Sequence, residues 1–352
     1  MRFAVGYQRP ENGESFPALV RDYTPAVAEV YFSWPGHASG RGGCVADWSD
    51  REVLEDDLKQ LRRDGVALDL LFNANCYGGR AVSSAFEREI GSLLEHLDGL
   101  GLMPDIVTAT SPFVADRVRC YFPTVERRAS VNMRIDSTLA LEYVADLFDS
   151  FHLRRDLQRD LPTVARFHDW AKAHGKKLCL IVNSGCLRNC PSQTFHDNLV
   201  AHDEAAAETR NVRDFAPHLC RRLYADRARW VEFLRGSWIR PEDLGAYEPY
   251  VSAAKLATRR HSHPRIVLGA YTSGRYDGNL ADLTEPGFSG VFAPFIIDNR
   301  RFPGDWPEIA GACAAECRHC GRCEAVLDKV LQHPFFCCPR PQNGKSTTQN
   351  NV

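Results

Sequence analysis

Two cysteines on a predicted loop have the spacing of metal ligands. In "IVNSGCLRNCPS", Cys186 and Cys190 follow an apolar run, on a loop that begins with a glycine and closes with a proline. Thiolates at this spacing can approach one soft metal centre from the same side. An isolated cysteine is more often a small buried apolar residue, but this pair is better explained by a shared metal.

A second group of cysteines lies near the C-terminal end. The stretch "CAAECRHCGRC" has the spacing C-x3-C-x2-C-x2-C and contains Cys313, Cys317, Cys320 and Cys323. Four thiolates in one short segment can enclose a metal centre without ligands from elsewhere. Zinc and iron–sulfur clusters both accept four thiolates, and the short gaps favour a cluster. The thirteen cysteines are better explained by metal ligands than by a disulfide framework if the chain is intracellular.

The segments around these cysteines alternate between strand and helix patterns. Apolar or β-branched runs predict strands: "RFAVGY", "VAEVYF", "ALDLLFNA", "DIVTAT", "RASVNMRI", "KLCLIVNS" and, less clearly, "WVEFLRGSW", "AAKLAT" and "RIVLGAY". Between them, segments such as "DREVLEDDLKQLRRDG" have apolar residues at helical spacing and end in glycine. Near-continuous apolar strands separated by helices are typical of a parallel sheet with helices outside.

About eight such units predict an α/β fold, a TIM-type (β/α)8-like barrel, with an open doubly wound sheet as the alternative. We expect the barrel to span 1–303, a cysteine-rich metal-binding appendage 304–338 and a disordered polar tail 339–352. Loops that follow barrel strands share one face, where barrel active sites form. Cys76 follows the third predicted strand and should approach the cysteine pair there, while Cys220 could fold back over the same face.

Composition says little about the partner. The formal net charge is -2 at pH 7, so nothing draws the whole chain towards nucleic acid or a membrane, and 44% hydrophobic residues suffice for a large core. The N-terminal stretch lacks the apolar core of a signal peptide, and no stretch approaches the ~20 apolar residues of a membrane span. We therefore expect a cytoplasmic protein that binds no membrane.

Several dispersed stretches resemble one known family. The stretches "IVNSGCLRNCPSQTFHDN", "LFNANCYGG", "ASVNMRI", "SWIRPEDLGAY" and "YDGNL" are similar to the collagenase-like peptidase family U32, and the likeness covers most of residues 1–325. Better-understood relatives are the iron–sulfur proteins of oxygen-independent hydroxylation, which act in ubiquinone synthesis or on tRNA and rRNA bases. The resemblance implies a barrel-like fold with four cysteines around a 4Fe-4S cluster, and hydroxylation rather than proteolysis.

The resemblance also suggests the cluster ligands. The pair in "GCLRNCP" matches the central cysteine motif of the family, and Cys220 is the candidate for the next ligand. The fourth ligand is open between Cys76, which the barrel geometry favours, Cys44 and Cys179. The expected cofactors are one 4Fe-4S cluster at the barrel mouth and a second cluster, or zinc, at the C-terminal cysteines.

Three further polar residues are candidates for catalysis. His196 follows the cysteine loop and could move a proton or hold a substrate group. Arg240 and Glu242, in "IRPED", lie at an expected strand-to-helix junction, where Arg240 could bind a substrate carboxylate. The basic cluster "RRHSH" at 259–263 is typical of a solvated surface. The hydrolase motifs H-E-x-x-H and G-x-S-x-G are absent from the sequence.

These observations favour an iron–sulfur oxidoreductase that carries out oxygen-independent hydroxylation, or a related redox modification, of a small biosynthetic substrate. The mouth cluster would be the reaction centre and the C-terminal centre would relay electrons. The expected partners are the small-molecule substrate, an electron-donor protein and a pathway protein, while nucleic acid is not favoured. Two alternatives stay open: a metal-dependent peptidase or hydrolase with structural zinc at the cysteines, and a non-catalytic iron–sulfur partner protein.

Overall fold

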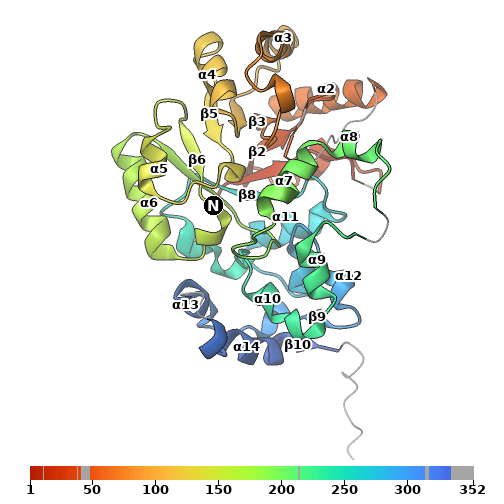
Figure 1. Ribbon diagram of the computed structural model, residues 1–352, viewed down its shortest axis with the longest axis vertical. Helices are drawn as coiled ribbons and strands as arrows, with labels where there is room; N and C mark the ends of the chain where they lie inside the picture. The colour runs from red at the N-terminus through yellow and green to blue at the C-terminus, as the bar shows by residue number, and fades with distance from the viewer. Residues whose placement is uncertain (11, 38, 41–47, 213–214, 314–316, 334–352) are drawn as a thin grey trace, which may run out of the picture.

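Eight parallel strands close into a barrel in the order β1 to β8 (Figure 1). The computed structural model describes the chain except residues 11, 38, 41–47, 213–214, 314–316 and 334–352. The strands are β1 Phe3–Gly6, β2 Val27–Phe32, β3 Ala67–Phe72, β4 Ile106–Ala109, β5 Glu126–Ala129, β6 Ser150–His152, β7 Lys177–Ile181 and β8 Ala253–Leu256. Phe3 pairs with Ala254, which closes the ring between β1 and β8. The predicted TIM-type barrel is confirmed.

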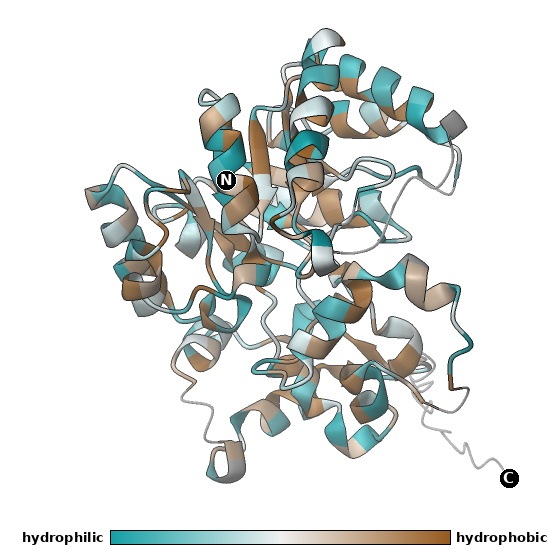
Figure 2. Cartoon of the chain, turned by 45° about the horizontal axis from the view of Figure 1, so that its top comes forward, coloured by the Kyte–Doolittle hydropathy of each residue, from teal (hydrophilic) through white to brown (hydrophobic). Residues whose placement is uncertain are grey.

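Helices cover the outside of the barrel. Those up to β7 are α1 Phe16–Arg21, α2 Trp48–Arg63, η1 Gly78–Arg80, α3 Ser84–Gly99, α4 Pro112–Tyr121, η2 Val131–Met133, α5 Thr138–Glu142, η3 Arg155–Leu157 and α6 Leu161–Ala173. Helix α3 shows why they form: the Ser83 hydroxyl accepts a hydrogen bond from the Phe86 amide, and Ile90, Leu94 and Leu97 bury one face. The helices at the top of Figure 2 correspondingly carry hydrophilic residues on their outer side.

A long excursion, residues 182–252, connects β7 to β8. It contains α7 Gln193–Ala201, α8 Asp203–Ala207, α9 Leu219–Tyr224, η4 Arg227–Arg229, α10 Val231–Leu234 and η5 Pro241–Tyr247. The strand predicted for "WVEFLRGSW" is wrong, because Val231 and Leu234 are buried at helical spacing on the short helix α10. A short apolar run does not by itself distinguish a strand from a buried helix.

After β8 the chain continues in short helices and a two-stranded sheet. Its elements are α11 Pro264–Ser273, η6 Leu280–Leu283, α12 Ser289–Phe292, β9 Ile296–Ile297, η7 Asn299–Arg301, α13 Trp306–Gly311, η8 Cys317–His319, α14 Arg322–Val330 and β10 Leu331–Gln332. The strand predicted for "RIVLGAY" is also wrong. Pro264 begins α11 and Gly274, in the left-handed conformation at φ 65°, ends it, as expected for helix start and stop signals.

The described part of the expected appendage packs against the barrel. The ring of Trp306 on α13 stacks on that of Trp238 with centroids 5.9 Å apart, and the Arg159 guanidinium lies 5.0 Å from the Trp306 ring centre. Val330 on α14 is fully buried in the main hydrophobic cluster, and β10 pairs with β9. The described residues of this segment, 304–313 and 317–333, thus share a core with the barrel. The expected tail 339–352 lies outside the described residues. Of the described helices, none is long and apolar enough to cross a membrane.

Candidate functional site at the barrel mouth

A small cavity, which we call the mouth pocket, lies at the carboxyl ends of the strands. It has a volume of about 70 Å³, and its lining includes Asn73, Asn132, Arg155, Asp197, Lys255 and Arg259. Because all barrel strands are parallel, residues distant in sequence meet at this one face. Four basic side chains and two carboxylates line the pocket, so it favours an anionic ligand.

A larger cavity, which we call the groove, opens beside the mouth pocket and has a volume of about 1000 Å³. One wall comes from the excursion between β7 and β8, where Phe195, Val212 and Phe215 are each more than half exposed. The other wall comes from the segments 260–263 and 281–289. The two cavities are contiguous, because both are lined by His196, Val200, Arg260 and Glu285.

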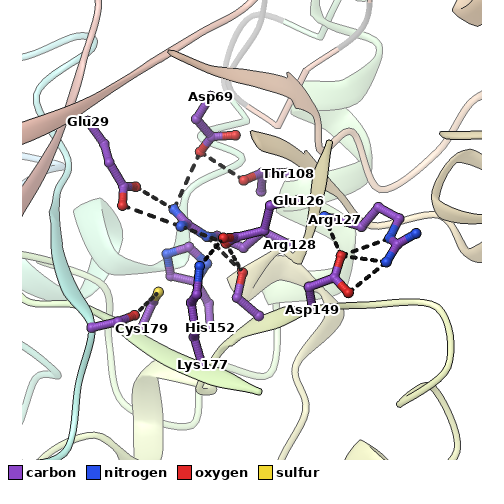
Figure 3. Close-up of polar contacts among 12 residues, drawn as sticks. Glu29, Asp69, Thr108, Glu126, Arg127, Arg128, Asp149, His152, Lys177 and Cys179 are labelled. Carbon is purple, nitrogen blue, oxygen red and sulfur yellow. Dashed lines mark hydrogen bonds and ion pairs between the residues drawn. The ribbon is translucent and has the colours of Figure 1, made fainter. Parts of the chain in front are cut away.

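Charged residues fill the barrel interior below the mouth pocket (Figure 3). Arg128 Nη1 donates to Glu29 Oε2 at 2.6 Å and lies 3.9 Å from Asp69 Oδ2, which also accepts a hydrogen bond from the Thr108 hydroxyl at 2.8 Å. Side chains alternate along a strand, so these residues of "VAEVYF" and "ALDLLF" point inward. Burial raises the pKa of Asp69 to about 6, although Arg128 and Lys255 oppose the shift.

Lys255 joins this interior network to the mouth pocket. Its side chain lines the pocket, and its Nζ lies 3.7 Å from the centre of the Tyr31 ring. No hydrogen bond joins the Lys255 amine to any residue that the structure describes. Burial lowers the pKa of Lys255 to about 8; Arg128 and Arg259 act in the same direction, and Asp69 opposes them. The amine therefore has a larger neutral fraction near neutral pH than an exposed lysine.

Arg155 connects the mouth pocket to the cysteine loop. Its Nη1 lies 3.3 Å from the Cys186 sulfur, to which it donates, and its Nη2 donates to Asn132 Oδ1 at 3.1 Å. Its Nε is buried and has no hydrogen-bond partner among the described residues. A buried donor without an acceptor is costly, so this guanidinium marks a place where a ligand acceptor would be favourable.

Three of the four predicted ligands of the first centre, Cys186, Cys190 and Cys220, influence one another electrostatically, and Cys220 lines the groove. Burial raises the pKa of Cys220 to about 11, with the thiol of Cys186 the next contribution. Burial likewise raises the pKa of Cys190, again with a contribution from Cys186. Cys76 sits apart from them in its described contacts: its sulfur accepts from the Gly78 amide at 3.4 Å. The Cys186 thiol therefore acts electrostatically on Cys190 and Cys220, and no described contact adds Cys76 to them.

The two alternative ligands do not complete this set within the described residues. Cys179 is buried on β7, and its sulfur lies 3.5 Å from the Ser252 hydroxyl inside the barrel. Cys44 lies outside the described residues. Burial is the main cause that raises the pKa of Cys179, Glu29 acts in the same direction, and the nearby Arg128 opposes the shift.

The C-terminal cysteines form a second, looser group. Burial raises the pKa of Cys317 and of Cys323, and Cys313 contributes to both shifts, whereas Cys320 is exposed. Across the part of the chain that the structure describes, no three His, Cys, Asp or Glu side chains are arranged to hold a metal ion. The thiols suit zinc or a cluster chemically, but as placed they do not fit one, and metal or cluster occupancy stays a prediction.

The predicted catalytic residues fall into two places. His196 lies where the groove meets the mouth pocket, and its ring packs edge-on against that of His218 with centroids 4.7 Å apart. Arg240 makes a bidentate pair with Asp243 at 2.8 and 2.7 Å. Glu242 accepts hydrogen bonds from the Asn299 side chain and a backbone amide. Neither Arg240 nor Glu242 is among the described residues that line the two cavities, and their catalytic role stays a prediction.

Several mouth residues were missed in the sequence. Asn73, Asn132 and Lys255 stand at or just after the ends of strands, and the rule that placed the cysteines at this face would have found them. The solvated surface expected for "RRHSH" is wrong for Arg259 and His261, which are both buried. The His261 Nε2 lies 2.8 Å from the Asp282 carbonyl oxygen, which compensates for its burial.

Comparison with known proteins gives a relative along most of the chain. No protein-family model matches the sequence. The chain is 26% identical over 313 residues to "Uncharacterized protease MJ1657" of Methanocaldococcus jannaschii, covering 86% of this chain and 89% of that protein. Among solved structures, a U32 peptidase, Mk0906, superposes with a TM-score of 0.48 at 16% identity, covering 61% of this chain and 82% of that one. The GH53 catalytic domain of Ignisphaera aggregans gives 0.36 at 10%, covering 58% and 77%.

The relative that spans most of the chain is named a protease, which agrees with the resemblance of the sequence to the peptidase family U32. It does not agree with the activity expected from the sequence. An iron–sulfur oxidoreductase with hydroxylase chemistry is wrong as the principal assignment, because the relative that spans most of the chain is named a protease. The name of this relative favours the peptidase alternative, for which the sequence showed no familiar hydrolase motif.

Proposed function

We propose that the chain is a peptidase that binds a peptide in the groove and hydrolyses it where the groove meets the mouth pocket. The observation that carries this proposal is the continuity of the apolar groove with the polar mouth through His196, Val200, Arg260 and Glu285. A peptide has apolar side chains on a polar backbone, and this pair of cavities offers surfaces for both. The protease name of the Methanocaldococcus jannaschii relative supports the same activity.

Two residues at the junction can supply the chemistry. His196 would take a proton from the water that attacks the scissile carbonyl and return it to the leaving amine. Arg260, which lines both cavities, would donate hydrogen bonds to the oxyanion that forms on the carbonyl oxygen. The packing of His196 against His218 holds its ring at the junction. No step passes through a metal or a cluster.

The test is digestion of a defined peptide mixture by the full-length chain, with new termini identified by mass spectrometry. We expect cleavage beside apolar residues, and we expect His196→Gln to lower kcat/KM by about 10²- to 10⁴-fold. His168→Gln is the matched control, since His168 lies on α6 and contacts Asp169 and Tyr250 instead of the cavities. Equal cleavage by His196→Gln would remove this histidine from the mechanism, and absence of cleavage by the unaltered chain would contradict the proposed function.

A further inference from the structure

We propose that the mouth pocket binds a small 2-oxo acid and that the Lys255 amine forms an imine with its carbonyl carbon. This site lies beside the groove and does not depend on peptide hydrolysis. The pocket volume of about 70 Å³ is far below the ~300–1,000 Å³ of sites for drug-sized ligands. A small ligand is therefore the one that fits the pocket itself.

The environment of Lys255 favours a nucleophilic amine. The side chain is 8% exposed, with its Nζ over the Tyr31 ring and no hydrogen-bonding carboxylate to keep it charged among the described residues. The ionisable groups that act on it or lie beside it are Glu29 on β2, Asp69 on β3, Arg128 on β5, His152 on β6 and Arg259 after β8. Asp69 and the ring face favour the ammonium form, but burial together with the two arginines outweighs them, and the pKa falls to about 8. Lysine nucleophiles are activated in this way, by desolvation and neighbouring cations.

The same pocket offers a site for a carboxylate. The buried guanidinium of Arg155 has an Nε donor without a partner among the described residues, and Arg260 also lines the pocket. Of the two carboxylates there, Asp197 is paired with Arg134 at 2.8 Å, so its charge is largely compensated. An arginine matches a ligand carboxylate in geometry as well as in charge. A carbonyl beside a carboxylate, the defining group of a 2-oxo acid, fits an amine beside these guanidinium groups.

The step involves no oxidation or reduction. The neutral Lys255 amine attacks the carbonyl carbon, a C–N bond forms, and both amine hydrogens leave with the carbonyl oxygen as water. The imine then takes up one proton from solvent, and the ligand carboxylate stays ionised. Binding of the anion beside the new cation stabilises the product, and the apolar ring of Tyr31 limits access of bulk water to one side of it.

The test is reductive trapping with pyruvate and borohydride, followed by peptide mapping of the unaltered full-length chain. We expect one carboxyethyl group on Lys255, with a trapping rate that rises with pH around a midpoint near 8. Acetone, which has the ketone without the carboxylate, should prefer Lys255 over the exposed Lys172 about tenfold less than pyruvate does at equal concentration. Because the site is mapped in the unaltered chain, the result does not depend on whether a variant folds.

Two variants sharpen the experiment. Lys255→Gln should lose the modification, whereas Lys172→Gln, on the outer helix α6, should retain it. Modification spread over many lysines, with Lys255 no faster than the rest, would overturn the proposal. An equal preference of acetone and pyruvate for Lys255 over Lys172 would overturn the assignment of a 2-oxo acid. A failure of peptide cleavage leaves this readout unaffected, so the two proposals are tested separately.

Discussion

Arg128 on β5 and Glu29 on β2 form an ion pair across the interior of the barrel, with Nη1 and Oε2 2.6 Å apart, although 99 residues separate them in sequence. The same guanidinium lies 3.9 Å from Asp69. It is shielded from water, since the Arg128 side chain is only 3% exposed. One buried cation therefore compensates Glu29 and Asp69 from neighbouring strands, and it also pairs with Glu126 at 3.1 Å. The barrel centre depends on this compensation as much as on apolar packing.

Removal of that cation should strongly destabilise the fold. Arg128→Met leaves Glu29 and Asp69 buried without their partner, so we expect the free energy of unfolding to fall by about 3–5 kcal/mol. Arg127→Met is the matched control, because Arg127 pairs with the partly exposed Asp149 (Figure 3) and should cost about 1 kcal/mol or less. Urea denaturation measures both. If both variants lose the same free energy of unfolding, the buried ion pairs of Arg128 contribute no more to stability than the partly exposed pair of Arg127.

The raised pKa of Asp69 makes stability depend on pH. Burial takes this pKa from 3.8 to about 6, so between these values the folded chain keeps a proton that the unfolded chain loses. The free energy of unfolding should then fall as pH rises through this window, by about 3 kcal/mol in total. Asp69→Asn cannot ionise and should lack this decline. Urea denaturation from about pH 4 to 7 compares the two proteins, and a wild type that gains stability relative to the variant as pH rises would contradict the direction of the shift.

Glycine is required where the cysteine loop meets the segment after β8. A Cβ built on Gly185 would lie 2.4 Å from the Pro286 carbonyl oxygen. The backbone at one of these residues would have to move to make room for a side chain. Gly185→Ala should therefore lower the free energy of unfolding by about 1–3 kcal/mol. Gly79→Ala, where a Cβ meets nothing within 4 Å, should change it little. Chemical denaturation measures the free energy of unfolding of both variants. If Gly185→Ala is as stable as the unaltered chain, the backbone around Gly185 relaxes without cost and this prediction is wrong.

Thiol alkylation should report the burial of each cysteine. Cys120 and Cys320 are exposed and should react first with iodoacetamide, while Cys179, 1% exposed and with its pKa raised by burial, should react only after unfolding. Peptide mapping by mass spectrometry gives the order. Rapid labelling of Cys179 in the folded chain would contradict its place in the barrel. A metal at the C-terminal cysteines would protect Cys320 until a chelator removes it, so the same samples test that prediction.

The barrel could be predicted because most of its strands and helices carry their own periodicity. The strand β6, Ser150–His152, was missed since three residues are too few to show a period. The charges inside the barrel were also visible in sequence, as Glu29 in "VAEVYF", but their partners were not. A charge inside an apolar run shows only that something must compensate it; which residue does so depends on the closure of the barrel.

In the candidate site too, some residues could be placed from local sequence patterns and others could not. Cys186 and Cys190 could be placed at the mouth because they directly follow a strand. The approach of Cys220 to them depends on how the long excursion folds back, and no local pattern encodes that path. Arg155 follows the missed strand β6, so its place at the mouth could not be predicted either.

One wall of the groove comes from a single stretch of chain that runs from the end of β7 to the start of β8. Surface connections of this kind accept substitutions, insertions and deletions far more readily than strands do. Descendants of one ancestral gene could therefore diverge in the ligands they admit by altering this stretch alone, while the ionic centre of the barrel is inherited unchanged. Selection for a new ligand and selection for a stable fold would then act on different parts of the gene.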